Sequence, residues 1–291
     1  MRSTNVRRAG FAALALALCT PAACGRAHED GDGGDDARPL AALRSAERST
    51  DRAESVRVRS TLSYGKALSL SSDGALRWQD GVTGHLTIRY TGGALAAAMR
   101  KAGTPSLTAR YLPDAYYARM SDTFAKRAGG RHWIKYGYAD LARGGDGFGM
   151  YLKDQMRNTT PNQSVKMLLA SGDVRRAGTE RVQGVEATHY RGRVRVADLA
   201  ARDSGLSARE LAGLKRQLDQ AGVRTETVDL WIDHRNLLVK KVERADTAQG
   251  SLVSTAYYRD YGVRVTAEAP PASDTRDFTE LARSRGTAKA R

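Results

Sequence analysis

Alternation of apolar and polar residues recurs along most of this chain, and it constrains the fold more than any other sequence feature. From Val56 to Tyr64, residues of one phase are mostly apolar and residues of the other, such as Arg57 and Arg59, are polar. That period of two is typical of a strand with one buried face. Further strands are predicted at 67–71, 75–79, 85–90, 106–112, 115–121, 131–136, 173–178, 180–197, 224–233, 237–246 and 251–260.

Helical spacing appears in only a few segments. It predicts helices at about 39–54, 160–171 and 207–221, and a short one at 148–158. The second and third begin with the residue spacing of a capping box. Connections of hairpin length, such as Gln183-Gly184, favour antiparallel pairing. The fold class predicted is therefore α+β, with the helices packed on one face of an antiparallel sheet.

The N-terminus has the features of an export signal. Arg2, Arg7 and Arg8 precede the longest apolar run, Phe11–Leu18. That run is too short to span a bilayer, which requires about 20 residues, but it has the length of a secretory h-region. We therefore expect this segment to be removed from the mature chain.

The segment around Cys24 resembles a bacterial lipobox, because two alanines precede the cysteine and a glycine follows it. The resemblance implies cleavage before Cys24 and a diacylglycerol on its thiol. Pro21 departs from the pattern, which prefers an aliphatic residue there. Two alternatives remain: lipidation at Cys19, where bulky Leu18 is unfavourable, or an ordinary signal cut near Ala23 that leaves Cys24 as a free thiol.

Composition divides the chain into four parts. Residues 1–23 form the signal peptide, and 24–37 form a flexible tether rich in Gly and Asp. No linker composition interrupts the following region, so 38–272 is predicted to be one domain. The polar, basic tail 273–291 is predicted to be disordered.

The charge balance indicates the kind of surface that the chain meets. Lys and Arg total 47 against 32 Asp and Glu, a formal net charge of +15. For an exported protein, such a charge favours anionic lipid headgroups or wall polymers, and not nucleic acid, as partners.

Sequence motifs for catalysis and for cofactors are missing. The chain has no nucleophile elbow, Walker A motif or dinucleotide-binding loop, and its five histidines fall in separate predicted elements. Its two cysteines cannot form a zinc site. We therefore expect no enzyme activity, no catalytic residues, no cofactor and no metal.

Several stretches, taken in order, resemble LolA-like lipoproteins of the LppX/LprG type. They are 41–62, Trp133-Ile-Lys135, the Gly178–Tyr190 hairpin, the Leu230–Val242 hairpin and the segment Tyr258–Ala272. The resemblance implies a strongly curved, half-barrel antiparallel sheet with helices packed on its concave face. It also implies an apolar cavity between sheet and helices, in a protein that carries acylated lipids or lipoproteins.

The function expected is that of a lipid-anchored protein on the extracytoplasmic face of the cell membrane, a monomer that binds or transfers an acylated lipid. Candidate cavity residues are Leu62, Leu107, Met120, Val165, Leu168, Leu169, Leu211, Leu214 and Leu218. Alternatively these residues are plain core, and the chain is an anchored interaction or sensory module that binds wall polymer or a protein. Trp133 and Trp231 are predicted to be buried in strands.

Overall fold

The structure is a computed structural model that describes residues 33–127, 129–143, 160–199 and 205–281. Cys24, the predicted signal peptide, the helix predicted at 148–158 and residues 282–291 lie outside these ranges. The described residues form one compact unit.

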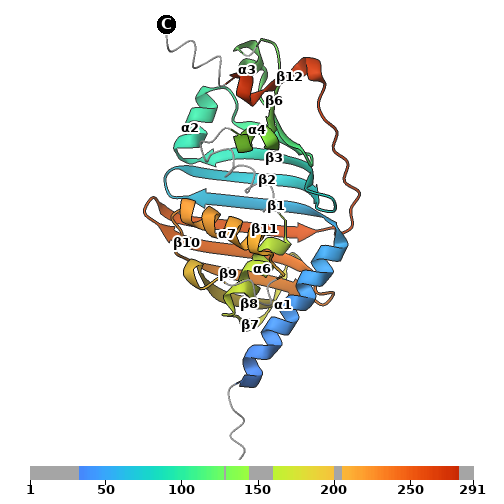
Figure 1. Cartoon of the computed structure of the whole chain (residues 1–291), viewed down its shortest axis with the longest axis vertical. Coiled ribbons are helices and arrows are strands. Elements are labelled where there is room, and N and C mark those ends of the chain that lie inside the picture. Colours follow the sequence, from blue (N-terminus) through green and yellow to red (C-terminus); the bar gives the residue numbers. More distant parts are fainter. Residues whose placement is uncertain (1–32, 128, 144–159, 200–204, 282–291) are drawn as a thin grey trace, which may run out of the picture. The chain divides into compact units, whose positions relative to one another are not determined.

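One sheet of twelve strands runs through the described residues (Figure 1). In chain order the strands are β1 (Ser55–Tyr64), β2 (Leu68–Arg77), β3 (Thr83–Gly92), β4 (Ser106–Tyr111), β5 (Ala115–Arg119), β6 (Trp133–Gly137), β7 (Arg175–Val182), β8 (Val185–Arg195), β9 (Thr225–Asp233), β10 (Leu238–Thr247), β11 (Gly250–Arg259) and β12 (Thr275–Asp277). Their spatial order is β12-β6-β5-β4-β3-β2-β1-β11-β10-β9-β8-β7. All neighbours pair antiparallel except β12 and β6, which are parallel. The predicted antiparallel α+β fold is thus confirmed.

The sheet is open, and it is not strongly curled as the resemblance implied. Its two edge strands, β12 and β7, lie at opposite ends of the strand order and do not pair with each other. Strong curvature needs bulges or a large stagger between strands. The described ladders instead run in continuous register apart from shifts at Ser69/Leu70, Arg176/Gly178 and Leu238/Lys240.

The described helices are α1 (Gly33–Ala53), α2 (Gly93–Lys101), α3 (Asp122–Arg127), α4 (Tyr138–Arg143), α6 (Asn162–Ser171) and α7 (Ala208–Gln220), with 3-10 turns η1 (Val196–Asp198) and η2 (Ala272–Asp274). Helices α1, α6 and α7 lie over the half of the sheet formed by β7–β11 (Figure 1). Helix α6 packs on α1, β8 and β9. We call the face that these helices cover the inner face, and the opposite one the outer face.

Helix α1 begins at Gly33, inside the stretch predicted as tether, and not at Pro39. Pro39 lies within the helix and is buried. The proline therefore does not mark the helix start, although it removes one backbone hydrogen bond from the helix interior.

Within the tail that is predicted to be disordered, residues 275–277 form strand β12, and the described residues extend to 281. Strand β12 pairs with β6, and the backbone N–H of His132 donates to Asp274 Oδ1 at 2.8 Å. The ring of Phe278 stacks on Tyr136 with centroids 4.8 Å apart. Through these contacts the tail packs at the edge of the sheet, which its polar composition did not indicate.

Candidate functional site between the sheet and its helices

Helix α6 contributes the most deeply buried part of the layer between helices and sheet. It ends at Gly172, whose φ of +68° is the left-handed conformation that glycine adopts freely. Its side chains Val165, Leu168 and Leu169 are buried against the inner face. A Cβ atom placed on Gly192 of β8 would lie 2.5 Å from Leu168 Cδ1. Helix and sheet are therefore in close contact at this point.

Helix α7 covers the neighbouring part of the sheet and begins as the sequence predicts. The Ser207 hydroxyl accepts from the Glu210 backbone N–H, and the Glu210 carboxylate accepts from the Ser207 backbone N–H, which completes a capping box. Leu214 and Leu218 are buried, and Leu211 is half-buried against the same cluster. The apolar stripe predicted for this helix thus faces the sheet.

The structure brings the predicted cavity residues together, with one exception. Leu107, Val165, Leu168, Leu169, Leu214 and Leu218 belong to one buried apolar cluster, and Met120 and Leu211 pack against it. Leu62 lies on the same inner face of β1, opposite Leu70 and Ser254, but outside this cluster. The layer is apolar and continuous from α6 and α7 to the strands.

A charged cluster lies within this apolar layer, and sequence reasoning missed it. Lys241 Nζ on β10 donates to Glu243 Oε2 and to the Ser164 hydroxyl of α6, each at 2.9 Å, and that hydroxyl donates to Glu243 Oε1 at 2.6 Å. Alternation along the strand could have revealed the cluster, because Lys241 and Glu243 lie at alternate positions with buried Ala245 and therefore on the same face of the strand. Ser164 thereby fixes α6 over β10.

Glu226 of β9 is a buried ionisable group in the same layer, between Ala245 and Val194 on the neighbouring strands. Burial, and then the nearby Glu243 carboxylate, raise the pKa of Glu226 to about 8, although Lys241 opposes the shift. Burial disfavours the charge of Lys241, but Glu243 outweighs it and the pKa of that amine is raised. Glu226 therefore holds a proton at neutral pH, next to a charged pair.

No protein-family model matches the chain. The Streptomyces coelicolor protein named "Putative lipoprotein SCO4650" is 53% identical to it over 246 residues, which cover 84% of this chain and 77% of that protein. The chain belongs to the SCO4650 family. A Streptomyces griseus relative, named "Uncharacterized 31.2 kDa protein in rplA-rplJ intergenic region", is 50% identical over 251 residues, 86% of this chain and 82% of the relative.

The fold of this SCO4650-family chain is similar to that of the lipoprotein LppX from Mycobacterium tuberculosis. The TM-score is 0.50 at 16% identity, over 80% of this chain and 100% of LppX. The fold resemblance predicted from the sequence is thus confirmed.

On the outer face, which α6 and α7 do not cover, the SCO4650-family chain buries Trp231 with polar side chains. The His189 ring stacks on the indole with centroids 4.3 Å apart, and Lys240 Nζ lies 3.8 Å from the indole centroid. Long basic side chains can cover apolar surface in this way while their charge stays in water. The predicted burial of Trp231 is confirmed, but in a small outer cluster and not in the main core.

Asp229 holds the cover of Trp231 in place. Its carboxylate is fully buried and accepts from Arg191 Nε at 2.6 Å and from Arg244 at 2.9 Å, and it lies 2.6 Å from His189 Nε2. Burial alone would raise the pKa of Asp229, but the hydrogen bonds from Arg191 and His189 outweigh it and lower the pKa.

Trp133 is buried on the same face and is also covered by a basic side chain, since the Arg110 guanidinium lies 4.6 Å from the indole centroid.

None of the helices in the described part of the chain has both the length and the apolar character needed to cross a membrane. Within the same ranges, no group of three or more His, Cys, Asp or Glu could hold a metal ion.

Proposed function

We propose that this SCO4650-family chain is an exported lipoprotein that is anchored on the extracytoplasmic face of the cell membrane and binds or transfers an acylated lipid. The observation that carries the proposal is the single apolar layer in which the stripes of α6 and α7 meet the inner face of the sheet. The relative named as a lipoprotein supports the anchor, and the LppX-like fold is compatible with a lipid carrier.

The layer contains apolar side chains that could contact the acyl chains of a lipid and charged side chains that could contact its headgroup. Each CH₂ group buried among its aliphatic side chains contributes about 0.8 kcal/mol. Lys241 and Glu243 are each still slightly accessible, with side-chain exposures of 15% and 13%, and they supply charged groups for a headgroup. Binding requires α6 or α7 to move away from the sheet, and it involves no catalytic step.

Enlarging a side chain in the layer tests this proposal. Leu214→Trp is expected to abolish co-purification of lipid, because the indole would occupy the space that α7 opens for an acyl chain when it moves away from the sheet, and the same movement would accommodate the added volume at little cost in stability. Native mass spectrometry of the purified chain measures the bound lipid, and thermal melting measures the stability. Leu95→Trp is the matched control, since Leu95 lies on α2 and is 41% exposed.

A second function is favoured by the close contact between Leu168 and Gly192. If the layer is a closed core, the chain is an anchored interaction or sensory module that binds wall polymer or a protein partner. In that case Leu214→Trp unfolds the protein, and the parent carries no lipid in native mass spectrometry. That pair of results would reject the lipid-binding proposal and leave the anchor proposal standing.

The anchor has its own test at Cys24, which precedes the described residues. Cys24→Ser removes the thiol that would carry the diacylglycerol, so the chain should move from the membrane pellet to the soluble fraction after cell fractionation. Cys19→Ser is the control and should leave the chain in the pellet. A Cys24→Ser chain that still sediments with membranes would refute lipidation at this residue.

A further inference from the structure

The outer face of β1–β4 has an unusual composition for a sheet surface. Its alternate positions carry arginines and small hydroxyl side chains, as the register of the four strands shows. The basic residues in this patch are Arg57, Arg59, Arg77, Arg89 and Arg110, and Asp73 is the carboxylate among these strand positions. The patch therefore has an excess of positive charge and of hydrogen-bond donors.

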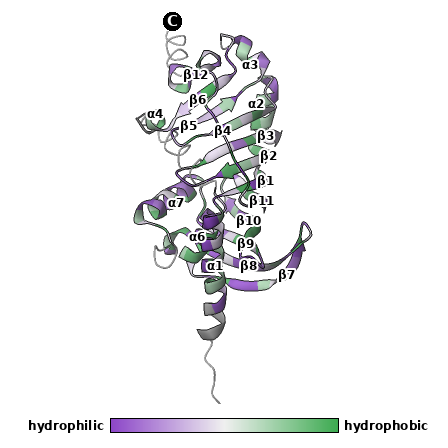
Figure 2. Ribbon diagram, turned by 90° about the vertical axis from the view of Figure 1, so that its right-hand side faces the viewer, coloured by the Kyte–Doolittle hydropathy of each residue, from purple (hydrophilic) through white to green (hydrophobic). Residues whose placement is uncertain are grey.

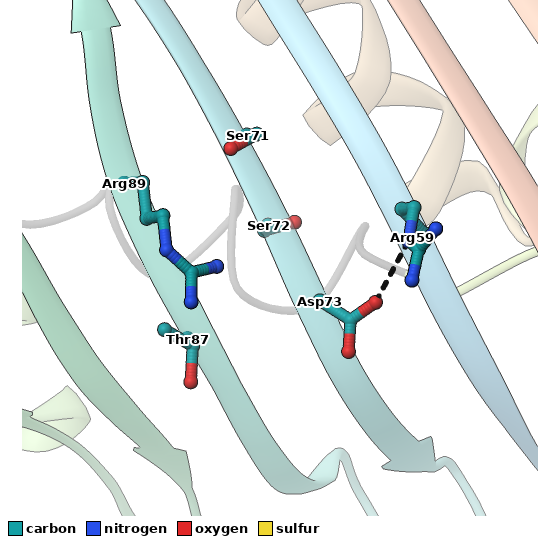
Figure 3. Close-up of a pocket in the computed structure, with 6 residues that line it drawn as sticks. All are labelled: Arg59, Ser71, Ser72, Asp73, Thr87 and Arg89. Carbon is teal, nitrogen blue, oxygen red and sulfur yellow. Dashed lines mark hydrogen bonds and ion pairs between the residues drawn. The ribbon is translucent and has the colours of Figure 1, made fainter.

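A pocket of about 350 Å³ lies in the middle of this patch (Figure 3). Its lining is entirely polar and consists of Arg59, Ser71, Ser72, Asp73, Thr87 and Arg89. Three neighbouring strands supply these residues, and the cross-strand partners Ser71–Arg89 and Asp73–Thr87 place hydroxyls beside charges. The positions of the groups are thus set by regular backbone pairing and not by a loop.

The two arginines of the pocket are in different situations. Arg59 Nε donates to Asp73 Oδ2 at 3.0 Å, so its charge is largely compensated. No contact within the described ranges neutralises the guanidinium of Arg89, which projects along the pocket beside Thr87 (Figure 3). One positive charge with five N–H donors is therefore available there to a ligand.

We propose that this pocket binds a phosphate group. A guanidinium presents paired donors that match two oxygens of a phosphate group, and the Ser71 and Thr87 hydroxyls add two further donors. An acyl chain or an aromatic ring finds no apolar side chain in this lining. Asp73 orients Arg59 and, as a fixed negative charge, keeps the affinity for the anion moderate. The pocket lies on the face opposite the α6 and α7 layer, so the proposal does not depend on lipid binding there.

Titration of the full chain with inorganic phosphate, followed by the Arg Nε–Hε NMR signals, tests the site. Arg89→Gln should weaken binding about tenfold, the loss expected for a charge-assisted hydrogen-bonded pair. The matched control Arg193→Gln removes the same charge from an exposed position of β8, outside the pocket, and should change the affinity less than about twofold. Asp73→Asn should strengthen binding, because it removes the repelling carboxylate.

Absence of saturable phosphate binding, equal losses in Arg89→Gln and Arg193→Gln, or weaker binding in Asp73→Asn would each overturn the proposal. Circular dichroism of each variant shows whether its fold is intact. Two further arms identify what carries the phosphate group: soluble polyphosphate, and vesicles of phosphatidylcholine with and without phosphatidylglycerol. Binding that depends on Arg89 in either arm supports the site and assigns its source.

Discussion

Replacing Trp231 with Ala is expected to lower the free energy of unfolding by about 3–5 kcal/mol, the usual cost of deleting a buried tryptophan. The indole fills a cluster with Val182, Ala187, Val239 and Val242 on the outer face of the sheet. Its loss leaves a cavity and also removes the contacts with His189 and Lys240. Urea denaturation at neutral pH measures the change.

Two comparisons make this result interpretable. Trp231→Phe keeps an aromatic ring under Lys240 and deletes an indole N–H that has no hydrogen-bond partner among the described residues, so it should cost clearly less than Trp231→Ala. Arg193→Ala on the same face should cost almost nothing, because Arg193 is exposed. Equal stability of Trp231→Ala and the parent chain would show that the outer cluster contributes nothing to the fold.

Glu226→Gln is expected to change how stability depends on pH. With a folded pKa of about 8 against an ordinary value of 4.5, the native chain keeps a proton that the unfolded chain releases. The parent therefore loses about 1.4 kcal/mol of this contribution per pH unit as pH rises from about 4.5 to 8. Glutamine does not titrate. The free energy of unfolding of the variant should therefore lack this decrease, which is on the order of 4 kcal/mol between pH 4.5 and 8.

Denaturation curves at a series of pH values give the two slopes. Glu180→Gln, an exposed carboxylate on β7, should keep the slope of the parent chain. Parallel slopes for Glu226→Gln and the parent would mean that Glu226 is ionised in the folded protein at neutral pH, and that its carboxylate is paired or hydrated.

Local signals in the sequence predicted the elements that depend on neighbouring residues. The Gln183-Gly184 turn joins β7 and β8 as expected, and both residues have positive φ, of 49° and 87°. The capping box of α7 and the apolar stripe of α6 are also where the sequence places them. The two segments predicted at 67–71 and 75–79 form one strand, β2. The polar residues between them, among them Asp73, do not interrupt the strand, because the Asp73 side chain lies on the outer face.

Features that depend on distant residues could not be predicted in this way. Helices α2, α3 and α4 are short and were missed, since few residues show their period. The curvature of the sheet follows from register and bulges, which periodicity does not encode. The pocket of Arg59 and Arg89 arises because strand pairing aligns side chains that lie apart in the sequence.

Strand β1 pairs with β2, the next strand in the chain, on one side, and with β11, near the end of the chain, on the other. The ladder between β1 and β11 is what joins the two halves of the sheet (Figure 2). Pairing over such a sequence separation is slow, because the loop between the strands must be closed first. A chain that ends before residue 250 would leave the whole of β1 as an unpaired edge, open to association with other chains.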